Sequence, residues 1–375
     1  MGNRIDIINL GCSKNLVDSE KLSRQLELCG YIVRHDPERI QCDIAIVNTC
    51  GFIGDAKEES INVILELASM KQSKQIKRLF VMGCLSGRYI DDLPSEIPEV
   101  DKFYGKFSWN EIVSDLGKSY HQESALQRTI TTPSHFAYLK ISEGCNRHCA
   151  YCAIPIITGR HLSRPMEEIV SEVEWLVQQG VKEFQVIAQD LSYYGKDLYG
   201  EFRLAELIEK ISDVPGIQWI RLHYAYPAKF PYDILRVIRE RDNVCNYLDI
   251  ALQHVSDPVL QRMRRNVSSK ETIELIRRIR DEVPGIHLRT TLLTGFPGES
   301  EADFEALMNF VKTMRFERMG AFPYSEEEGT YSALHYYDDI PFEVKQARVD
   351  QLMEIQQQIS EELNRAKIGS VLRVI

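Results

Sequence analysis

The chain has 375 residues, of which 44% are hydrophobic and 27% are charged, and its formal net charge is −10. This length is too great for one ordinary hydrophobic core, so we expect two or more domains. No segment stays apolar for long enough to span a bilayer, and the acidic balance gives no general attraction for nucleic acid.

The first part of the chain alternates between strand and helix patterns. These patterns lie, in order, at 4–12, 19–30, 42–50, 56–70 and 78–84. The alternation predicts a parallel sheet with right-handed crossovers. Arg4 and Asp6 interrupt any signal-peptide core near the N-terminus, so we expect a cytoplasmic protein with no membrane partner.

The polar stretch from Gly117 to His135 loses this periodicity and is typical of a linker. Beyond it, six strand patterns recur, each followed by a helical pattern, at 136–142, 183–190, 217–224, 247–254, 286–295 and 318–325. Six units are too few for a closed eight-stranded barrel, so we expect an open, partial barrel whose strand C-termini form the working rim. We therefore expect one domain over 1–125, a second over 133–366, and a strand-like remainder over 367–375.

The densest chemical signal is a C-x3-C-x2-C run just after the first barrel strand. It consists of Cys145, Cys149 and Cys152. Nine cysteines without an export signal favour metal or redox use over disulfide bonds. Three thiolates can hold three irons of a four-iron cubane and leave the fourth iron open to a ligand. The alternative is a structural zinc site with a fourth ligand such as His148.

A second group of cysteines is dispersed along the first domain. Cys12, Cys50 and Cys84 each follow a predicted strand. A single cysteine at such a place is most often a small buried hydrophobic residue. The C-terminal ends of parallel strands face one common crevice, however, and convergence there would give a second triad with an open iron. The remaining cysteines, Cys29, Cys42 and Cys245, lack this placement and are interpreted as packing residues.

Further polar groups are predicted to lie on the barrel rim. Gln189 with Asp190 and Gln253 with His254 end two of the strands, where they either bind a nucleoside or cap the next helix. The string GFPGE at 295–299 suits a close backbone approach to a ligand, although it lacks the spacing of a phosphate loop. The arginines at 262, 264 and 265 are interpreted as a solvated helix face.

At this point the sequence resembles a known family, the radical S-adenosylmethionine (SAM) methylthiotransferases, along nearly all its length. The matching strings, in family order, are GCSKNLVDSE (11–20), GCNRHCAYCAIP (144–155), SRP (163–165), QD (189–190) with YG (194–195), LQH (252–254), GFPGE (295–299) and YSEEEGT (324–330). Two cysteine triads make the resemblance specific. Within the family, GCSKN and EEEGT resemble the branch that methylthiolates an aspartate of a small-subunit ribosomal protein.

The resemblance implies the fold and the cofactors. The α/β fold would be an N-terminal parallel-sheet methylthiotransferase domain followed by a partial (β/α)6 radical SAM barrel, with the C-terminal TRAM domain absent beyond its first strand at 367–375. One 4Fe-4S cluster would sit on Cys12, Cys50 and Cys84, and another on Cys145, Cys149 and Cys152. SAM would bind the second cluster, with its adenine near Tyr151.

The resemblance also implies the chemistry and the partners. Reductive cleavage of SAM would yield a 5′-deoxyadenosyl radical, because the target carbon–hydrogen bond has no acidity for a general base to exploit. The cluster of the first domain would hold sulfide, which a first SAM methylates. The electron would come from a donor such as flavodoxin or ferredoxin, and the sulfur donor is left open. No acid–base dyad is predicted.

Two other functions compete with this prediction. The first is the same chemistry on a tRNA adenosine, which the acidic balance weakly disfavours because phosphate binding draws on Lys and Arg. The second is a non-catalytic iron–sulfur carrier. Two three-cysteine sites argue against a carrier, because electron-transfer clusters normally have all four irons bound by protein.

Overall fold

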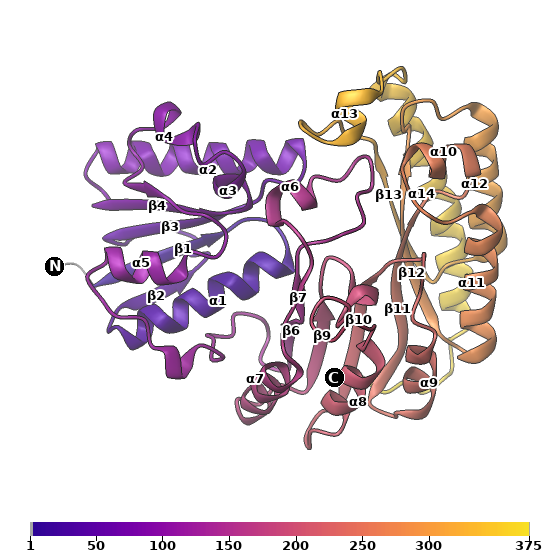
Figure 1. Cartoon of the computed structure of the whole chain (residues 1–375), viewed down its shortest axis with the longest axis horizontal. Helices are drawn as coiled ribbons and strands as arrows, with labels where there is room; N and C mark the ends of the chain where they lie inside the picture. The colour runs from indigo at the N-terminus through magenta and orange to yellow at the C-terminus, as the bar shows by residue number, and fades with distance from the viewer. Residues whose placement is uncertain (1–2, 375) are drawn as a thin grey trace. The chain divides into compact units, whose positions relative to one another are not determined.

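Strands with buried side chains on both faces form the first sheet of the chain, whose computed structural model describes residues 3–374. All its neighbouring strands are parallel, in the order β2-β1-β3-β4-β5 (Figure 1). The strands are β1 (Arg4–Asn9), β2 (Ile32–His35), β3 (Ile44–Thr49), β4 (Arg78–Gly83) and β5 (Lys102–Phe103). The predicted parallel sheet is confirmed, and the short strands β2 and β5 extend it at both edges.

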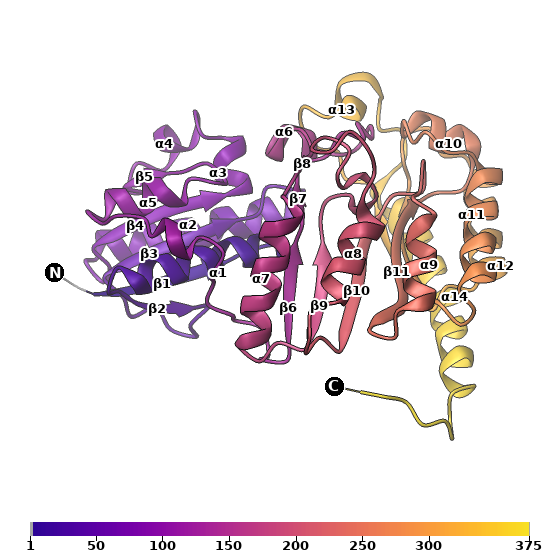
Figure 2. The same cartoon turned by 60° about the horizontal axis from the view of Figure 1, so that its bottom comes forward.

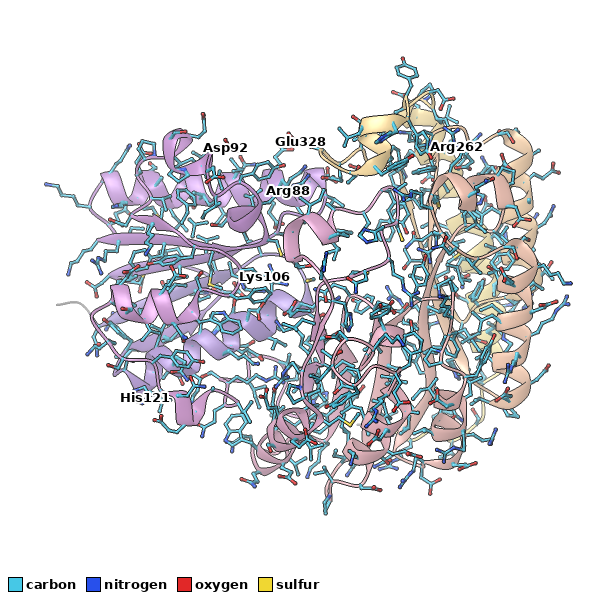
Figure 3. The ribbon with its side chains drawn as sticks, in the orientation of Figure 1. Arg88, Asp92, Lys106, His121, Arg262 and Glu328 are labelled. Atoms are coloured by element: carbon cyan, nitrogen blue, oxygen red, sulfur yellow. The ribbon has the colours of Figure 1, made fainter. Side chains whose placement is uncertain are left out.

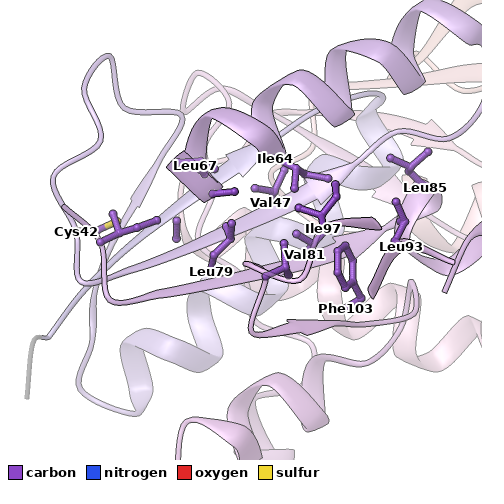
Figure 4. Packing of buried hydrophobic residues seen from close by; sticks show 14 residues of the cluster. Cys42, Val47, Ile64, Leu67, Leu79, Val81, Leu85, Leu93, Ile97 and Phe103 are labelled. Atoms are coloured by element: carbon purple, nitrogen blue, oxygen red, sulfur yellow. The ribbon is translucent and has the colours of Figure 1, made fainter. Parts of the chain in front are cut away.

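Two helical layers cover the two faces of this sheet. On one face, Ala45 and Val47 of β3 pack with α2 (Gly54–Gln72), α3 (Cys84–Arg88) and α4 (Leu93–Glu96) (Figure 4). On the other face, Ile44 and Ile46 pack with α1 (Ser13–Leu28) and α5 (Trp109–Asp115). The period-two alternation of β3 therefore divides the core into two clusters, as expected for a sheet buried on both sides.

The polar stretch predicted to be a linker is ordered against α1. It contains only a short 3-10 helix, η1 (Gln122–Ser124), yet Arg128 within it has a fully buried side chain. Its guanidinium lies 2.8 Å from Glu20 Oε2 and 3.1 Å from Glu172 Oε1, and both carboxylates are buried. Lys21 lies 3.9 Å from Glu172 and adds a second positive charge. This polar stretch therefore contributes to a buried ionic network, in which each charge lies beside an opposite charge.

The second sheet has six parallel strands in the order β13-β12-β11-β10-β9-β6, and the predicted partial barrel is confirmed. The strands are β6 (Phe136–Lys140), β9 (Glu183–Ile187), β10 (Trp219–Ala225), β11 (Val244–Gln253), β12 (His287–Thr294) and β13 (Arg318–Pro323). A short antiparallel pair, β7 (Ser142–Glu143) with β8 (Leu162–Ser163), was not predicted.

Helices connect these strands and cover one side of the second sheet (Figure 2). They are α8 (Leu204–Ser212), α9 (Asp233–Glu240), α10 (Asp257–Arg262), α11 (Ser269–Glu282), α12 (Glu301–Met314) and α14 (Phe342–Arg365). Four further elements complete the order, namely α6 (Ile154–Thr158), α7 (Met166–Gln178), η2 (Leu191–Tyr193) and α13 (Tyr331–His335). None of the helices that the structure describes combines the length and the apolar character of a membrane span.

The contacts divide the chain into two compact units. The first contains the residues up to Lys140 together with Ala153–Gly159 and Glu167–Gly180, and the second contains Ile141–Cys152, Arg160–Met166 and the chain from Val181 onward. The boundaries predicted at 125 and 133 remain a prediction. The expected strand at the end of the chain is wrong for residues 370–374, which form no regular structure, and residues 1, 2 and 375 lie outside the described residues.

We predict that the Arg128 network makes a large contribution to the stability of the first unit. Arg128→Met removes the buried guanidinium from between Glu20 and Glu172 and leaves Lys21 as the cation beside Glu172, which should lower the free energy of unfolding by about 3–5 kcal/mol. Arg24→Met is the matched control, because the Arg24–Glu27 pair is about one-third exposed on both sides and should contribute about 1 kcal/mol or less. Urea unfolding followed by circular dichroism compares the two variants. Equal losses would contradict the buried network.

Candidate functional site

Three strand ends bring the first cysteine triad together. Cys12 precedes α1 at the end of β1, Cys50 directly follows β3, and Cys84 directly follows β4. The Sγ atoms of Cys12 and Cys84 lie 4.0 Å and 3.6 Å from the same atom, Oδ1 of Asn15. Asn15 is itself held because its Nδ2 donates to the backbone oxygens of Leu10 and Thr49 at 3.1 Å and 2.9 Å. Convergence of Cys12 and Cys84 on Asn15 agrees with the predicted crevice.

A glycine beside each of these cysteines lets the three loops approach closely. A Cβ on Gly11 would lie 2.9 Å from Cβ of Cys50 and 3.2 Å from its Sγ. A Cβ on Gly51 would lie 2.8 Å from the backbone nitrogen of Leu85, next to Cys84. Gly83 has φ +101° and ψ −159°, a conformation open essentially to glycine alone. The close spacing of the three cysteines therefore depends on the absence of a Cβ atom at these three glycines.

Burial governs the protonation of the first triad. It is the largest cause that raises the pKa of Cys84 to about 12; Cys12 and Cys50 contribute to this shift, and Lys106 opposes it. Burial likewise raises the pKa of Cys50. Lys106 and Arg88 are labelled in Figure 3, and Arg88 donates to the backbone oxygen of Gly51 at 3.0 Å. Bound metal deprotonates coordinating thiols outright, so this donor set fits a cationic cluster better than it fits three free thiolates.

One loop of the second unit carries the other triad. Cys145, Cys149 and Cys152 lie between β7 and α6, and the backbone nitrogen of Cys152 donates to the oxygen of Cys149 at 3.1 Å. Ala150 between them is fully buried, and its nitrogen donates to the oxygen of Met263 at 2.9 Å. Burial raises the pKa of Cys145 to about 12. The loop is therefore fixed at its centre, while its cysteines remain partly accessible.

None of the nine cysteines, all of which lie within residues 3–374, forms a disulfide bond. In the same described range no three or more His, Cys, Asp or Glu side chains surround the position of a single metal ion. A cubane does not require such an arrangement, because each of its cysteines binds a different iron. Cys42 belongs to one hydrophobic cluster of the first unit and Cys29 packs against the other, as predicted, and Cys245 is a residue of β11.

Arg265 is the main functional candidate that the sequence analysis missed. Interpreting it as part of a solvated face is wrong, because only 4% of the residue is exposed. Its Nη1 lies 2.8 Å from Oη of Tyr151 and 3.8 Å from Sγ of Cys149. A buried cation is therefore aimed at the cysteine loop. The run of arginines carried no signal that could distinguish this one from the exposed Arg264 and the half-buried Arg262.

Tyr226 joins a second arginine to the same place. Its hydroxyl lies 3.8 Å from Sγ of Cys149. The guanidinium carbons of Arg147 and Arg265 lie 4.3 Å and 4.4 Å from its ring centroid, within the range of cation–π attraction. Arg147 also pairs with Asp190 at 2.6 Å. Arg265 and Tyr226 thus approach one sulfur of the triad directly, while Arg147 contacts the ring of the same tyrosine.

The three residues predicted to contact SAM differ from one another in their surroundings. The hydroxyl of Tyr151 accepts from Arg265, and burial raises its pKa well above the usual value, so it keeps its proton. Gln189 donates to Glu143 at 3.2 Å, while its own buried Oε1 has no hydrogen-bond partner within the described chain. Gln253 ends β11 with φ +70°. Gln189 is therefore a ready acceptor for a ligand donor such as an amino group.

The neighbours of these glutamines have structural roles. Asp190 accepts from the backbone nitrogen of Ser192 at 3.0 Å and caps η2. His254 is fully buried, and its Nδ1 accepts from the nitrogen of Ser256 at 3.0 Å. Asp190 agrees with the capping alternative, whereas α10 begins after Ser256 without a side-chain cap, so His254 holds only the loop before that helix.

The GFPGE string packs against residues of the cysteine loop. Glu299 accepts hydrogen bonds from the backbone nitrogens of Gly295 and Phe296, which closes the turn on itself. The ring of Phe296 lies 6.4 Å from that of Tyr151 and 5.1 Å from that of Tyr324, edge to face in both pairs. Ala150 belongs to the same buried cluster. The string thus acts in packing, and nothing in its geometry indicates a phosphate site.

Two family models match the chain in the order predicted from the sequence. The model described as the radical SAM superfamily matches residues 139–311, and the model described as uncharacterized protein family UPF0004 matches residues 4–105. The two models thus match the two cysteine triads separately.

Several curated proteins that are similar to the chain carry the name ribosomal protein uS12 methylthiotransferase RimO. The protein from Bacteroides thetaiotaomicron is 67% identical over 372 residues, which cover 99% of this chain and 85% of that protein. The protein from Porphyromonas gingivalis is 63% identical, with coverage of 100% and 86%. The protein from Flavobacterium johnsoniae is 49% identical, with coverage of 100% and 85%.

Solved structures with a similar fold are more distant in sequence. The methyltransferase TsrM from Kitasatospora setae, with cobalamin and a [4Fe-4S] cluster bound, has a TM-score of 0.60 and 15% identity, covering 86% of this chain and 75% of that one. The radical enzyme OxsB has a TM-score of 0.59 and 14% identity, covering 96% and 56%. At these identities the likeness shows the fold alone.

We predict that Gly83→Ala disrupts the first triad. A Cβ there would lie 2.6 Å from both the nitrogen and the oxygen of the Thr49 backbone, so the strand ends must move apart. Gly30→Ala is the control, because Gly30 also has positive φ but its Cβ would meet nothing within 4 Å. The control should cost only about 1 kcal/mol of backbone strain.

Iron bound per chain after anaerobic reconstitution measures the effect of the change on the triad. The urea midpoint before reconstitution measures its effect on stability. Gly83→Ala should lose about half of the iron and Gly30→Ala none. Equal iron in the two variants would show that the approach of the strand ends does not determine the site.

Proposed function

The chain belongs to the RimO family of radical SAM methylthiotransferases, and from that premise we propose that it adds a methylthio group to an aspartate of ribosomal protein uS12. The observation that carries the proposal is the presence of two separate three-cysteine sites in a chain that matches proteins of this name over its whole length. Members of this family are enzymes that use SAM and 4Fe-4S clusters.

Each triad is proposed to hold one cluster. Cys145, Cys149 and Cys152 would hold the cluster that binds SAM, and Cys12, Cys50 and Cys84 would hold the auxiliary cluster. Bound together, the clusters and SAM supply the electron, the hydrogen-atom abstraction and the sulfur that no amino-acid side chain provides. The side chains around them bind, orient and exclude water.

The side chains around Cys149 are proposed to orient the cluster and SAM. Arg265 and the hydroxyl of Tyr226 both approach its sulfur at 3.8 Å, and hydrogen bonds to cysteine sulfurs of this kind adjust the electronics of a cluster. Tyr151, with its hydroxyl held by Arg265, would place its ring beside the adenine. Gln189 would accept a hydrogen bond from SAM through its unused Oε1, and Gln253 would line the same rim.

A protein substrate fits the charge of the chain better than a tRNA does. The net charge of −10 opposes the phosphate contacts on which RNA binding depends. A ribosomal protein must carry Lys and Arg to bind ribosomal RNA, so it is attracted rather than repelled. The electron donor is proposed to be a small reducing protein such as flavodoxin or ferredoxin.

We predict that the chain binds about eight irons after anaerobic reconstitution, as two cubanes of four. Replacing Cys145, Cys149 and Cys152 by Ala should remove about half of the iron and abolish SAM cleavage, because the open iron binds SAM there. Replacing Cys12, Cys50 and Cys84 should remove the other half and leave some cleavage. Iron analysis and detection of 5′-deoxyadenosine measure both effects. Triple replacement of Cys29, Cys42 and Cys245 is the control, and an iron content unchanged in either triad variant would exclude the two-cluster arrangement.

We predict that uS12 gains the mass of a methylthio group when it is incubated with the reconstituted enzyme, SAM, sulfide and a reductant. Tandem mass spectrometry should place the added mass on an aspartate. Transfer RNA is offered to the same reconstituted enzyme as the competing substrate, and its nucleosides are analysed in parallel. Modified adenosine together with unmodified uS12 would reverse the assignment.

A further inference from the structure

A strongly acidic segment with exposed aromatic side chains follows the last barrel strand. Residues 326–344, which we call the acidic segment, contain six Asp and Glu residues and no Lys or Arg. Glu327 is buried and Asp338 pairs with Lys345, so the exposed charge comes from the other four. Five large hydrophobic side chains in it are exposed to solvent, namely Tyr331 (37%), Leu334 (69%), Tyr337 (86%), Phe342 (62%) and Val344 (39%). Exposed apolar groups concentrated in this way mark interaction sites more often than scattered ones do.

The acidic segment is ordered by contacts with the rest of the second unit. Thr330 caps α13 (Tyr331–His335) by accepting from the nitrogen of Ala333. The ring of Tyr331 stacks on that of His335 with centroids 4.0 Å apart, and the guanidinium of Arg264 lies 4.3 Å from the Tyr331 ring. Asp339 accepts from the nitrogen of Gly298 at 3.0 Å. A binding partner would therefore meet a preorganised surface and pay little entropy for ordering it.

The acidic segment is attached directly to the cysteine loop. The nitrogen and the hydroxyl of Ser332 donate to the backbone oxygen of Ala150 at 2.8 Å and 2.9 Å. Ala150 lies between Cys149 and Tyr151 in the sequence. The hydroxyl of Tyr336 donates to the oxygen of Arg262 at 3.2 Å. A polypeptide bound to the acidic segment is thereby held next to the cysteine loop at the carboxyl ends of the barrel strands.

The charge of the acidic segment selects among possible partners. Glu326 and Glu328 lie exposed on the loop before α13, where Figure 3 labels Glu328, and Glu343 is exposed at the start of α14. Such a surface attracts a basic polypeptide and repels a nucleic acid, whose backbone carries a negative charge at every phosphate. The exposed rings and Leu334 add apolar area that a folded protein loop can contact. The phosphates of RNA offer no apolar surface to match it.

We propose that the acidic segment is the docking surface for the basic protein substrate, which it holds at the mouth of the barrel. This inference rests on the proposed function and adds to it the surface by which uS12 is recognised. Charge complementarity increases the rate of encounter, and the apolar side chains of α13 and of the following residues slow dissociation. The substrate aspartate then reaches the rim beside Tyr151 and Gln189 from a fixed direction.

Two double variants test the two parts of the surface. Glu326→Lys/Glu328→Lys reverses its charge, and Leu334→Ser/Tyr337→Ser removes two large side chains that are 69% and 86% exposed. Each should raise the KM for uS12 about tenfold while kcat stays within about twofold, because the chemistry at the rim is untouched. The increase in KM with added salt should be steep for the unmodified chain and shallow for the charge variant.

The matched control is Glu274→Lys/Glu305→Lys, which makes the same charge change on exposed positions of α11 and α12. Its KM for uS12 should stay within about twofold of the unmodified chain. Iron content after reconstitution confirms that every variant is folded. If the charge variant loses iron, the Leu334→Ser/Tyr337→Ser variant still decides the question.

The outcomes separate this inference from the proposed function. If the unmodified chain does not modify uS12, the proposed function is wrong. If the unmodified chain modifies uS12 and both double variants do so with unchanged KM, the docking surface is wrong. It is equally wrong if sedimentation shows a dimer of the unmodified chain that Leu334→Ser/Tyr337→Ser dissociates, because the surface would then join two copies of the chain.

Discussion

Three thiols held close together in a partly buried place repel one another as soon as they ionise, and both cysteine sites of this chain must satisfy that constraint. Burial and neighbouring cysteines raise the pKa of Cys84, and burial raises that of Cys145, so the metal-free triads favour protonated thiols. The first unit brings its sulfurs together by backbone approach at Gly11, Gly51 and Gly83. The second unit adds cations instead, because Arg265 and Arg147 surround Tyr226 beside Cys149.

Much of the architecture could be predicted from local patterns. The three long strands of the first sheet and all six strands of the second were predicted, because each is an apolar run followed by a helical period. The positions of Cys12, Cys50 and Cys84 followed from a rule of topology, since parallel strands end at one edge of their sheet. The two-residue strand β5 carries too few side chains to show any period, so it was not predicted.

What the sequence could not reveal depends on contacts between distant residues. Arg128 and Arg265 look like solvated charges in the sequence, and both are buried because partners far along the chain compensate them. For Arg128 the partner is Glu20, more than one hundred residues away, and for Arg265 it is Tyr151. Charge runs are therefore ambiguous, because the pairing that decides between surface and core is a property of the fold. Of the acidic segment, only residues 326–330 were recognised from the sequence, as part of a family string.

The two triads differ in how far apart their members lie along the chain, and this difference sets an order for assembly. Cys145, Cys149 and Cys152 span eight residues, so they can meet iron as soon as one short loop has left the ribosome. Cys12, Cys50 and Cys84 become a site only when β1, β3 and β4 have paired, which is slow because the contacts are non-local. Biogenesis must therefore deliver iron to a folded sheet in one unit and tolerate capture by an unfolded loop in the other.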